Sequence, residues 1–240
     1  MTTRRRDKEE TRDLLLEAAF EMLLEQGLDV GWGIRVADVT SRVGLTTGAA
    51  YQIWNGSRSR DGLGGQDRFH RDLARYTFER LLGDPTTGTR AEIDGMSGDG
   101  RSLEAMVQLT TAGARHIAEP SQFAIYIAVC SAVSSIPELG EVGRAGYERL
   151  TAAYTEAIGK NLTQFELEVI PPHTLEDLIV SAVALYDGLC LRQLVDPGSV
   201  RGDLEPPAGV PDDAQGPWHI AAVGVLALIR GMTRPVDTAG

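Results

Sequence analysis

The sequence has little of several features that define other classes of protein. Its 240 residues contain two cysteines, Cys130 and Cys190, which lie in separate apolar runs and form no C-x-x-C pair. They indicate no disulfide framework, so a reducing cytoplasm is the expected compartment. The longest uninterrupted apolar run, residues 220–229, has about half the length of a membrane span, and no apolar segment follows the N-terminal arginines. We therefore expect a soluble protein with no signal peptide and no membrane partner.

The motifs of common enzymes are also missing. The four histidines, His70, His116, His173 and His219, are widely scattered, and no H-E-x-x-H or G-x-S-x-G sequence occurs. The glycines of residues 62–65 lack the preceding strand that a dinucleotide-binding loop requires. The sequence therefore predicts no metal, no cofactor and no catalytic residue. An active site assembled from separate helices stays an alternative.

Acidic charge is in excess, but only in part of the chain. The formal net charge is −11, from 23 basic and 34 acidic residues, which argues at first against a nucleic-acid partner. Residues 1–90 hold 14 basic and 14 acidic side chains, so the excess lies entirely in residues 91–240. Only Lys8 and Lys160 are lysines, and arginine is the better residue for planar contacts to phosphates and bases. This division predicts two parts with different partners.

Apolar residues recur at helical spacing through most of the chain, and no segment keeps a period of two. Proline or glycine stands at many of the boundaries. The glycine-rich segment 83–100 predicts a flexible loop. The sequence therefore predicts an all-α fold without a sheet, with helices over residues 11–26, 36–43, 47–54, 66–82, 101–118, 121–134, 138–160, 174–195 and 217–232.

The first three of these segments have the form of a helix-turn-helix domain. In residues 11–26 the apolar side chains follow the spacing of one buried helical face. Residues 36–54 contain two short helices joined by a turn at Gly44, and Thr46 is placed to cap the second helix. A short helix presented in this way is the element that enters a DNA major groove in such domains.

Three pieces of this region resemble the DNA-binding domain of the tetracycline-repressor (TetR) family of bacterial transcription regulators. TRDLLLEAAF (11–20) is similar to the family's first helix, VADVTSRVGLT (36–46) to its second helix and turn, and GAAYQIW (48–54) to its Gly-x-x-Tyr-x-x-aromatic recognition helix. The pieces stand in the family's order and cover about 50 of 240 residues. The resemblance implies a DNA-binding domain over residues 1–63 and a helical ligand-binding and dimerisation domain over residues 64–240.

The residue types of the expected recognition helix suit a major groove, because small or polar side chains can approach the base edges there. Gln52 can form a bidentate bond to adenine, and the resemblance implies that the Tyr51 hydroxyl binds a phosphate. Trp54 is expected instead to be a core anchor that holds this helix on the first one. The expected DNA contacts from this helix are Thr46, Thr47, Gly48, Ala49, Tyr51 and Gln52.

Arginines flank the recognition helix on both sides, where each could neutralise a phosphate and release counterions. A solvated basic tail is the alternative for the N-terminal arm, and simple exposure is the alternative for the arginine of the preceding helix. The expected contacts are Arg4, Arg5 and Arg6 from the arm, Arg42 from the preceding helix, and Arg58 and Arg60 after the recognition helix.

The chain departs from the family pattern at three places. Arg35 stands where the family usually has a Thr or Ser that caps the second helix, and Thr47 stands where a Lys or Arg often precedes the glycine. The loop after Trp54 is one residue longer than usual, so Arg58 is not in strict register with the family's phosphate-binding lysine. These departures predict an unusual operator, with Arg60 supplying part of the missing charge.

The resemblance also implies an effector pocket among the C-terminal helices. Polar and aromatic residues are interleaved there with apolar ones at helical spacing, as a mainly apolar ligand site requires. Core packing is the alternative for each of these residues. The expected lining residues are Met106, Thr110, His116, Phe123, Tyr126, Cys130, Tyr147 and Tyr154.

A dimer interface is expected in the last two helices. LYDGLCLRQLVDP (185–197) is similar to the penultimate helix of many family members, which implies a four-helix bundle across a two-fold axis. Residues 218–229 are apolar almost all round, and a monomer would expose a sizeable patch there. An ordinary internal core helix is the alternative. The expected interface residues are Leu185, Gly188, Leu189, Trp218, Ala221, Gly224, Val225 and Leu228.

Together these features predict a ligand-responsive transcription regulator, in the first place a repressor, that binds double-stranded operator DNA as a homodimer. A small apolar or aromatic effector would favour a state whose two DNA-binding heads are badly spaced, so that DNA and effector weaken each other's binding. A helical protein-interaction module whose helix-turn-helix no longer reads DNA is the other alternative, since the N-terminal third is electrically neutral.

Overall fold

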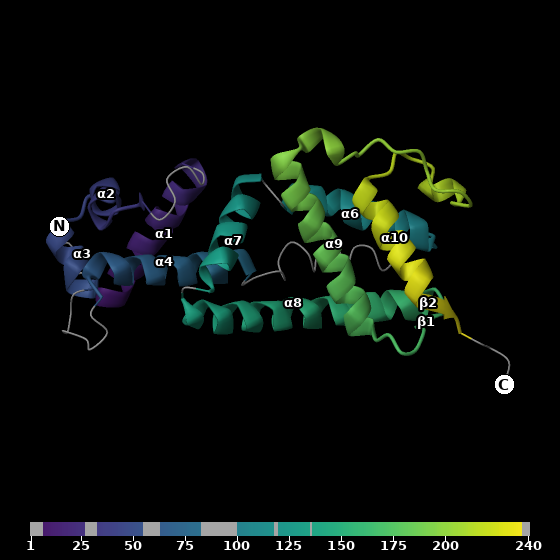
Figure 1. The fold of residues 1–240 in the computed structure, drawn as a ribbon, viewed down its shortest axis with the longest axis horizontal. Helices are drawn as coiled ribbons and strands as arrows, with labels where there is room; N and C mark the ends of the chain where they lie inside the picture. Colours follow the sequence, from purple (N-terminus) through teal and green to yellow (C-terminus); the bar gives the residue numbers. More distant parts are fainter. Residues whose placement is uncertain are drawn as a thin grey trace. The chain divides into compact units, whose positions relative to one another are not determined.

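The structure is a computed structural model that describes residues 7–26, 33–54, 63–82, 100–117, 120–134 and 136–236 (Figure 1). The chain forms two compact units. The first unit comprises residues 1–83 and 124–144, and the second comprises residues 84–123 and 145–240. The long helix α8 (Pro137–Gln164) belongs to the first unit as far as Arg144 and to the second beyond it.

The first unit is built around a helix-turn-helix that packs on a longer helix. Helices α1, α2 and α3 contact one another, and α1 and α3 both pack against α4 (Figure 1). The elements of this unit are α1 (Lys8–Gln26), α2 (Val36–Arg42), α3 (Thr47–Trp54), α4 (Gly65–Leu82), most of α7 (Pro120–Ala132) and the start of α8.

Local sequence explains where α1 begins and which face it buries. The Asp7 carboxylate accepts a hydrogen bond from the Glu10 amide N–H, and the Glu10 carboxylate accepts one from the Asp7 amide. This reciprocal pair is a capping box, so the helix begins at Lys8 rather than at the expected residue 11. The face predicted from the apolar spacing is buried in the core of the first unit, through Leu15, Leu16, Ala18, Ala19, Met22 and Leu23.

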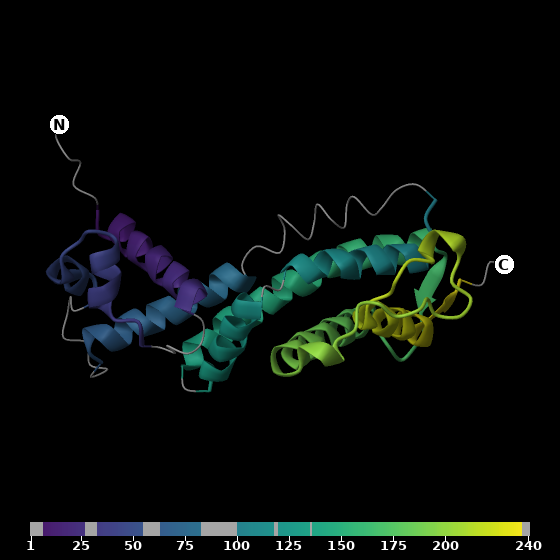
Figure 2. The ribbon, with the colours of Figure 1, turned by 90° about the horizontal axis from the view of Figure 1, so that it is seen from above.

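The second unit packs its last two long helices side by side. It contains α6 (Leu103–Ile117), the rest of α8, β1 (Leu167–Val169), α9 (Leu175–Val195), the 3-10 turns η2 (Pro197–Ser199) and η3 (Asp212–Ala214), α10 (Ile220–Met232) and β2 (Thr233–Pro235). Helix α10 lies along α9 and also contacts α6 (Figure 2). Trp218 is the largest fully buried side chain here, and its indole N–H donates to the Ala214 carbonyl at 2.9 Å.

The all-α fold predicted from the sequence is confirmed, with helix boundaries close to the expected ones. One expectation is wrong in detail: β1 and β2 pair antiparallel, Leu167 opposite Pro235 and Val169 opposite Thr233. Three-residue strands are too short to show a period-two pattern, which is why the sequence did not reveal them. The expected loop 83–100 lies outside the described residues except for Gly100. The expected domain boundary after residue 63 stays a prediction, and α4 packs with the helices before it.

Candidate nucleic-acid interface

The turn between α2 and α3 has the geometry expected of a helix-turn-helix. Gly44 adopts a φ of +68°, a conformation that side chains other than glycine rarely tolerate, so the chain can reverse directly after α2. The Leu45 amide then donates to the Thr40 carbonyl at 2.9 Å. The Thr46 hydroxyl accepts a hydrogen bond from the Ala49 amide at 3.3 Å, which confirms Thr46 as the cap of α3.

Helix α3 is fixed from behind by its last residue. Trp54 is 4% exposed and its ring meets Phe69 edge to face, with centroids 5.0 Å apart. The indole N–H donates to the Asp72 carboxylate at 2.9 Å, and the Arg68 guanidinium donates to the Trp54 carbonyl at 3.0 Å. Trp54 is therefore a core anchor, as expected, but the side chains that it contacts belong to α4 and not to the first helix.

Asp72 joins three helices at one carboxylate. Its Oδ2 atom accepts both the Trp54 indole N–H and the Arg12 Nε–H, the latter at 2.8 Å. This bond to Asp72 is the main cause of a raised pKa for Arg12. Charge-assisted hydrogen bonds of this kind are directional, so they fix α3 relative to both α1 and α4. Sequence reasoning missed Asp72, because nothing local marks an aspartate that serves residues 18 and 60 positions away.

The missing cap of α2 is replaced by a side chain from α4. Arg35 occupies the N-cap position and forms no side-chain capping bond, as the departure from the family pattern suggested. Instead, the Gln66 side-chain carbonyl accepts the Val36 amide N–H at 3.1 Å, and its amide group donates to the Ile34 carbonyl at 2.9 Å. One glutamine thus satisfies an orphan donor at the helix start and fixes the chain that leads into it.

The outward face of α3 presents the residues expected to meet DNA. Thr46, Gly48 and Gln52 are exposed, and Thr47, Ala49 and Tyr51 are partly buried. A Cβ atom built at Gly48 would meet none of the described residues within 4 Å, so packing against them does not require glycine there. The expected contacts Arg4, Arg5, Arg6, Arg58 and Arg60 lie outside the described residues.

Arg42 already forms ion pairs within the first unit. Its guanidinium donates to both carboxylate oxygens of Glu25, at 2.6 and 2.8 Å, and approaches Glu21 at 3.4 Å. The bond to Glu25 raises the pKa of Arg42, and the bond from Arg42 lowers the pKa of Glu25. A phosphate contact from Arg42 would therefore have to displace Glu25.

The residues expected to line an effector pocket are distributed over both units. Tyr126 stacks on Phe78 at 6.4 Å and Cys130 packs on the core of the first unit. In the second unit Met106 and Phe123 are buried, Tyr154 is partly buried and Tyr147 is 36% exposed. Thr110 and His116 belong to α6, but their side chains lie outside the described set. The pocket that they were expected to form stays a prediction.

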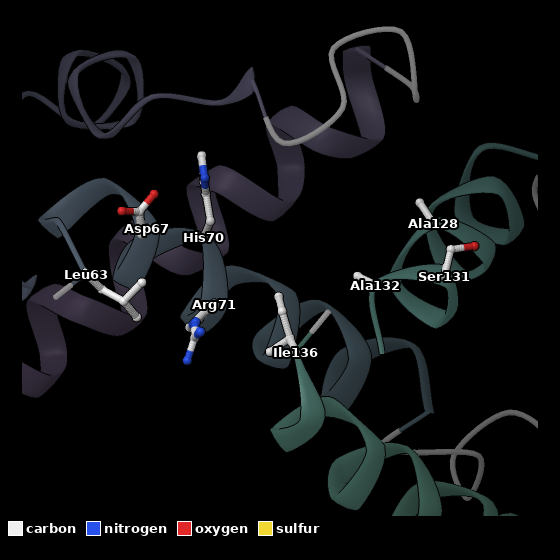
Figure 3. Close-up of a pocket in the computed structure, with 8 residues that line it drawn as sticks. All are labelled: Leu63, Asp67, His70, Arg71, Ala128, Ser131, Ala132 and Ile136. Atoms are coloured by element: carbon white, nitrogen blue, oxygen red, sulfur yellow. The ribbon is translucent and has the colours of Figure 1, made fainter. Parts of the chain in front are cut away.

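The structure does describe a cavity within the first unit, between α4 and α7 (Figure 3). Its volume is about 500 Å³, within the range of small-molecule sites. None of the residues expected to bind an effector lines it. The lining residues are Leu63, Asp67, His70, Arg71, Ala128, Ser131, Ala132 and Ile136.

Several residues expected at a dimer interface pack within the single chain. Trp218 and Ala221 are buried, and Leu185 fills the space beside Gly224, where an added Cβ would approach its Cδ2 atom to 2.6 Å. Gly188 is exposed, whereas Leu189, Val225 and Leu228 are partly buried. Glycine at 224 therefore serves the close approach of α9 and α10 in one chain.

Helix α9 exposes an apolar stripe of which only Gly188 was among the expected interface residues. Val180, Leu191 and Val195 are 53%, 45% and 79% exposed, and Ala184 and Gly188 share their face at spacings of three, four and seven residues. Of the described helices, α9 alone is long and apolar enough to cross a membrane, with 17% of its most apolar window buried in the chain. We refer to Val180, Ala184, Gly188, Leu191 and Val195 as the α9 stripe.

Metal and thiol chemistry receive no support from the described side chains. Over these residues no group of three or more His, Cys, Asp or Glu side chains is placed to hold a metal ion. Burial raises the pKa of the Cys190 thiol, with a smaller opposing effect from Tyr186. A raised pKa disfavours the reactive thiolate form of this cysteine.

Of the comparisons with known proteins, the one with solved structures bears on the fold. No protein-family model and no curated protein matches the sequence. Among solved structures, a Rhodococcus sp. protein classed with the TetR-family transcriptional regulators matches with a TM-score of 0.50 and 16% identity, over 93% of this chain and 98% of that chain. The chain therefore has a TetR-like fold, in agreement with the resemblance carried by residues 11–54.

Proposed function

We propose that the protein is a transcription regulator that binds double-stranded operator DNA through α3 as a homodimer. The observation that carries the proposal is the way in which α3 is held. Its inner face is bonded to α4 and α1 through Trp54 and Asp72, and its outer face presents small and polar side chains. A recognition helix needs one face fixed to the rest of the domain and the other face accessible to DNA, because base contacts require fixed side-chain positions.

Gly48 supports the same conclusion. Gly48 is the second residue of α3, and the described residues leave room for a side chain there. A partner that needs close approach to the start of α3 accounts for the glycine. Free N–H groups at a helix N-terminus favour a phosphate, which is the partner that DNA would offer.

The second copy in the proposed homodimer covers the α9 stripe. Three large aliphatic side chains on one helical face are exposed in the single chain, and soluble proteins rarely leave such a patch open. A second copy presents the same stripe, so a two-fold axis beside α9 buries both at once. The Asp187 carboxylate on the same helix would disfavour insertion in a membrane, which supports a cytoplasmic location.

An effector completes the proposed function. A small apolar or aromatic molecule bound among the C-terminal helices would favour a dimer whose heads do not match successive major grooves, and would release the operator. The neutral charge of residues 1–90 supports weak non-specific binding to DNA, from which such release is easy. Repression is the mode that this release mechanism serves directly.

A salt titration of binding to the DNA upstream of the protein's own gene tests the proposal. We expect a sequence-preferring complex whose affinity falls steeply with salt, measured by fluorescence anisotropy on labelled duplexes. Tyr51→Phe and Arg58→Ala should weaken binding to all sequences, whereas Gln52→Ala should relax the preference at one base position. A complex that shows neither salt sensitivity nor sequence preference contradicts the proposal.

One observation favours a second candidate, a helical protein-interaction module. Arg42 is neutralised by Glu25 and Glu21, which lowers the positive charge of the face that would approach DNA. In that case α3 would bind a protein surface, and the same titration would detect no DNA complex. An enzyme has no comparable support from the described side chains.

A further inference from the structure

We propose that the cavity between α4 and α7 binds a small monocarboxylate with an apolar body, whose carboxylate group pairs with Arg71. This site is distinct from the effector pocket expected among the C-terminal helices. All eight lining residues belong to the first unit, so the cavity is a property of one compact body (Figure 3).

The lining has the chemistry of a ligand site. On α4 the residues Asp67, His70 and Arg71 follow the spacing of one helical face, and Leu63 lies just before that helix. On α7 the facing residues are small, Ala128, Ser131 and Ala132, and they leave the space that the cavity occupies. Aliphatic walls with a few polar groups are typical of sites for small organic molecules.

Arg71 is the group that selects an anion. Its guanidinium lies 3.4 Å from the Glu138 carboxylate, and the two side chains are 40% and 68% exposed. An exposed pair at that distance contributes little stability, so a ligand carboxylate can replace Glu138 at small cost. The planar guanidinium then offers two parallel donors to the new carboxylate.

The negative charge of Asp67 disfavours a ligand that carries a second anionic group. The apolar part of the ligand would lie away from this carboxylate. The Asp67 carboxylate already accepts the Gly64 amide N–H at 3.1 Å, which caps the start of α4. In the view of Figure 3 the side chains of Asp67 and Arg71 extend in different directions from the first turns of α4. A second anionic group would be repelled by Asp67, whereas an apolar body can contact Ile136 and the two alanines.

Occupancy of this cavity acts on the helix that holds α3. Arg71 stands between Arg68 and Asp72, the two residues of α4 that bond Trp54. A ligand that repositions this turn of α4 therefore changes the support of the recognition helix directly. This consequence for DNA rests on the proposed function, whereas the binding site itself does not.

Calorimetric titration of the full chain with benzoate and 3-methylbutanoate tests the site. We expect saturable binding of one molecule per chain, with benzamide and benzylamine binding at least about tenfold more weakly. Arg71→Gln should weaken carboxylate binding about tenfold or more, and Ala132→Leu should do the same by filling the space. Arg75→Gln is the matched control, because Arg75 stands one turn further along α4 and pairs with Glu79.

Three results would overturn the proposal: no binding of either carboxylate, tighter binding of benzylamine, or equal affinities for the Arg71→Gln protein and the control. Anisotropy on operator DNA with and without benzoate forms a separate arm. Carboxylate binding without any DNA complex would leave the site in place and contradict the proposed function instead. DNA binding that benzoate does not alter would overturn the coupling through α4.

Discussion

Helices α1 and α9 have similar lengths, 19 and 21 residues, but they treat their apolar side chains in opposite ways. Helix α1 buries seven residues, six of them in the core of the first unit. Helix α9 buries two, Leu178 and Ile179, and exposes Val180, Leu191 and Val195. The first unit buries its apolar helix faces in its own core, whereas α9 leaves three large aliphatic side chains exposed. The effect of substitutions in α9 on stability should therefore depend on protein concentration, whereas the effect of substitutions in α1 should not.

Gly143 and Gly48 show the same contrast between an internal contact and an exposed position. At Gly143 an added Cβ would meet the Phe78 ring at 2.4 Å, so this glycine allows α8 to pack against α4. At Gly48 the same atom would meet open space. One glycine serves the interior of the chain, and the other leaves room for something outside it.

The largest expected effect is in the core of the first unit. Leu73 is fully buried, and Leu73→Ala should lower the free energy of unfolding by about 3 kcal/mol, through lost apolar contacts and the remaining cavity. Urea denaturation measures the change. Val195→Ala, on the exposed stripe, should cost less than about 1 kcal/mol and only at protein concentrations where the dimer forms. Equal losses for both variants would remove the contrast between the core of the first unit and α9.

A smaller effect is expected at Asp72, which joins three helices. Asp72→Ala leaves the Trp54 indole N–H and the Arg12 guanidinium without their shared acceptor, and should lower the free energy of unfolding by about 2 kcal/mol. Asp13→Ala is the control, since Asp13 is exposed and lies 3.8 Å from the same Arg12. In the Asp72→Ala protein the loss in the free energy of DNA binding should exceed the loss in the free energy of unfolding. A normal affinity would show that α3 does not need this support.

The α9 stripe is tested by placing a charge on it. Leu191→Glu should raise the dissociation constant of the homodimer at least about tenfold, because a charge buried between two apolar stripes loses its hydration. Sedimentation equilibrium measures the constant. Leu109→Glu is the matched control, a similarly exposed leucine on α6 that should leave the constant unchanged. A larger effect at position 109 would place the interface on α6 instead.

Gly48→Ala should separate folding from binding. Because the added methyl group has room, the variant should be more stable by up to about 1 kcal/mol in thermal denaturation. Its affinity for operator DNA should nevertheless fall. Gly143→Ala should instead lower stability, since Phe78 would have to move. Unchanged DNA affinity in the Gly48 variant would remove the argument that a partner requires this glycine.

The smallest effects are expected from two aspartates of α9 with opposite pH dependence. Burial raises the pKa of Asp187, so its charge costs stability, and this cost grows as pH rises above the unfolded value near 3.8. Asp187→Asn should therefore raise the melting temperature at neutral pH and not below that value. Hydrogen bonds from Thr174 lower the pKa of Asp177, so its contribution is present above pH 3.8 and is lost as pH falls through the folded value. Asp177→Asn should accordingly lower the neutral melting temperature.

The sequence predicted what local rules govern. Helix periodicity, the Gly44 turn and the Thr46 cap each depend on residues close together in the chain, and all of them agree with the structure. The start of α1 was also available, because Asp-x-x-Glu at residues 7–10 is a capping-box sequence.

What could not be predicted depends on distant partners. Gln66 caps a helix 30 residues before it, and Arg42 pairs with glutamates 17 and 21 residues away. The cavity is lined by α4 and α7, whose facing residues carry no motif. Whether an apolar helix such as α10 is covered by its own chain or by a partner also depends on packing that periodicity does not specify.

The pairing of Arg42 with Glu25 makes any contact of this arginine with DNA an ion exchange. A free arginine that binds a phosphate releases the cation that had condensed there. When Arg42 leaves Glu25 for a phosphate, the abandoned carboxylate takes up a cation in return, and little net release remains. The salt slope of DNA binding should therefore count one phosphate contact fewer than the protein makes, and Glu25→Gln should steepen that slope by about one. Glu25 thus serves as the counterion of Arg42 until DNA binds.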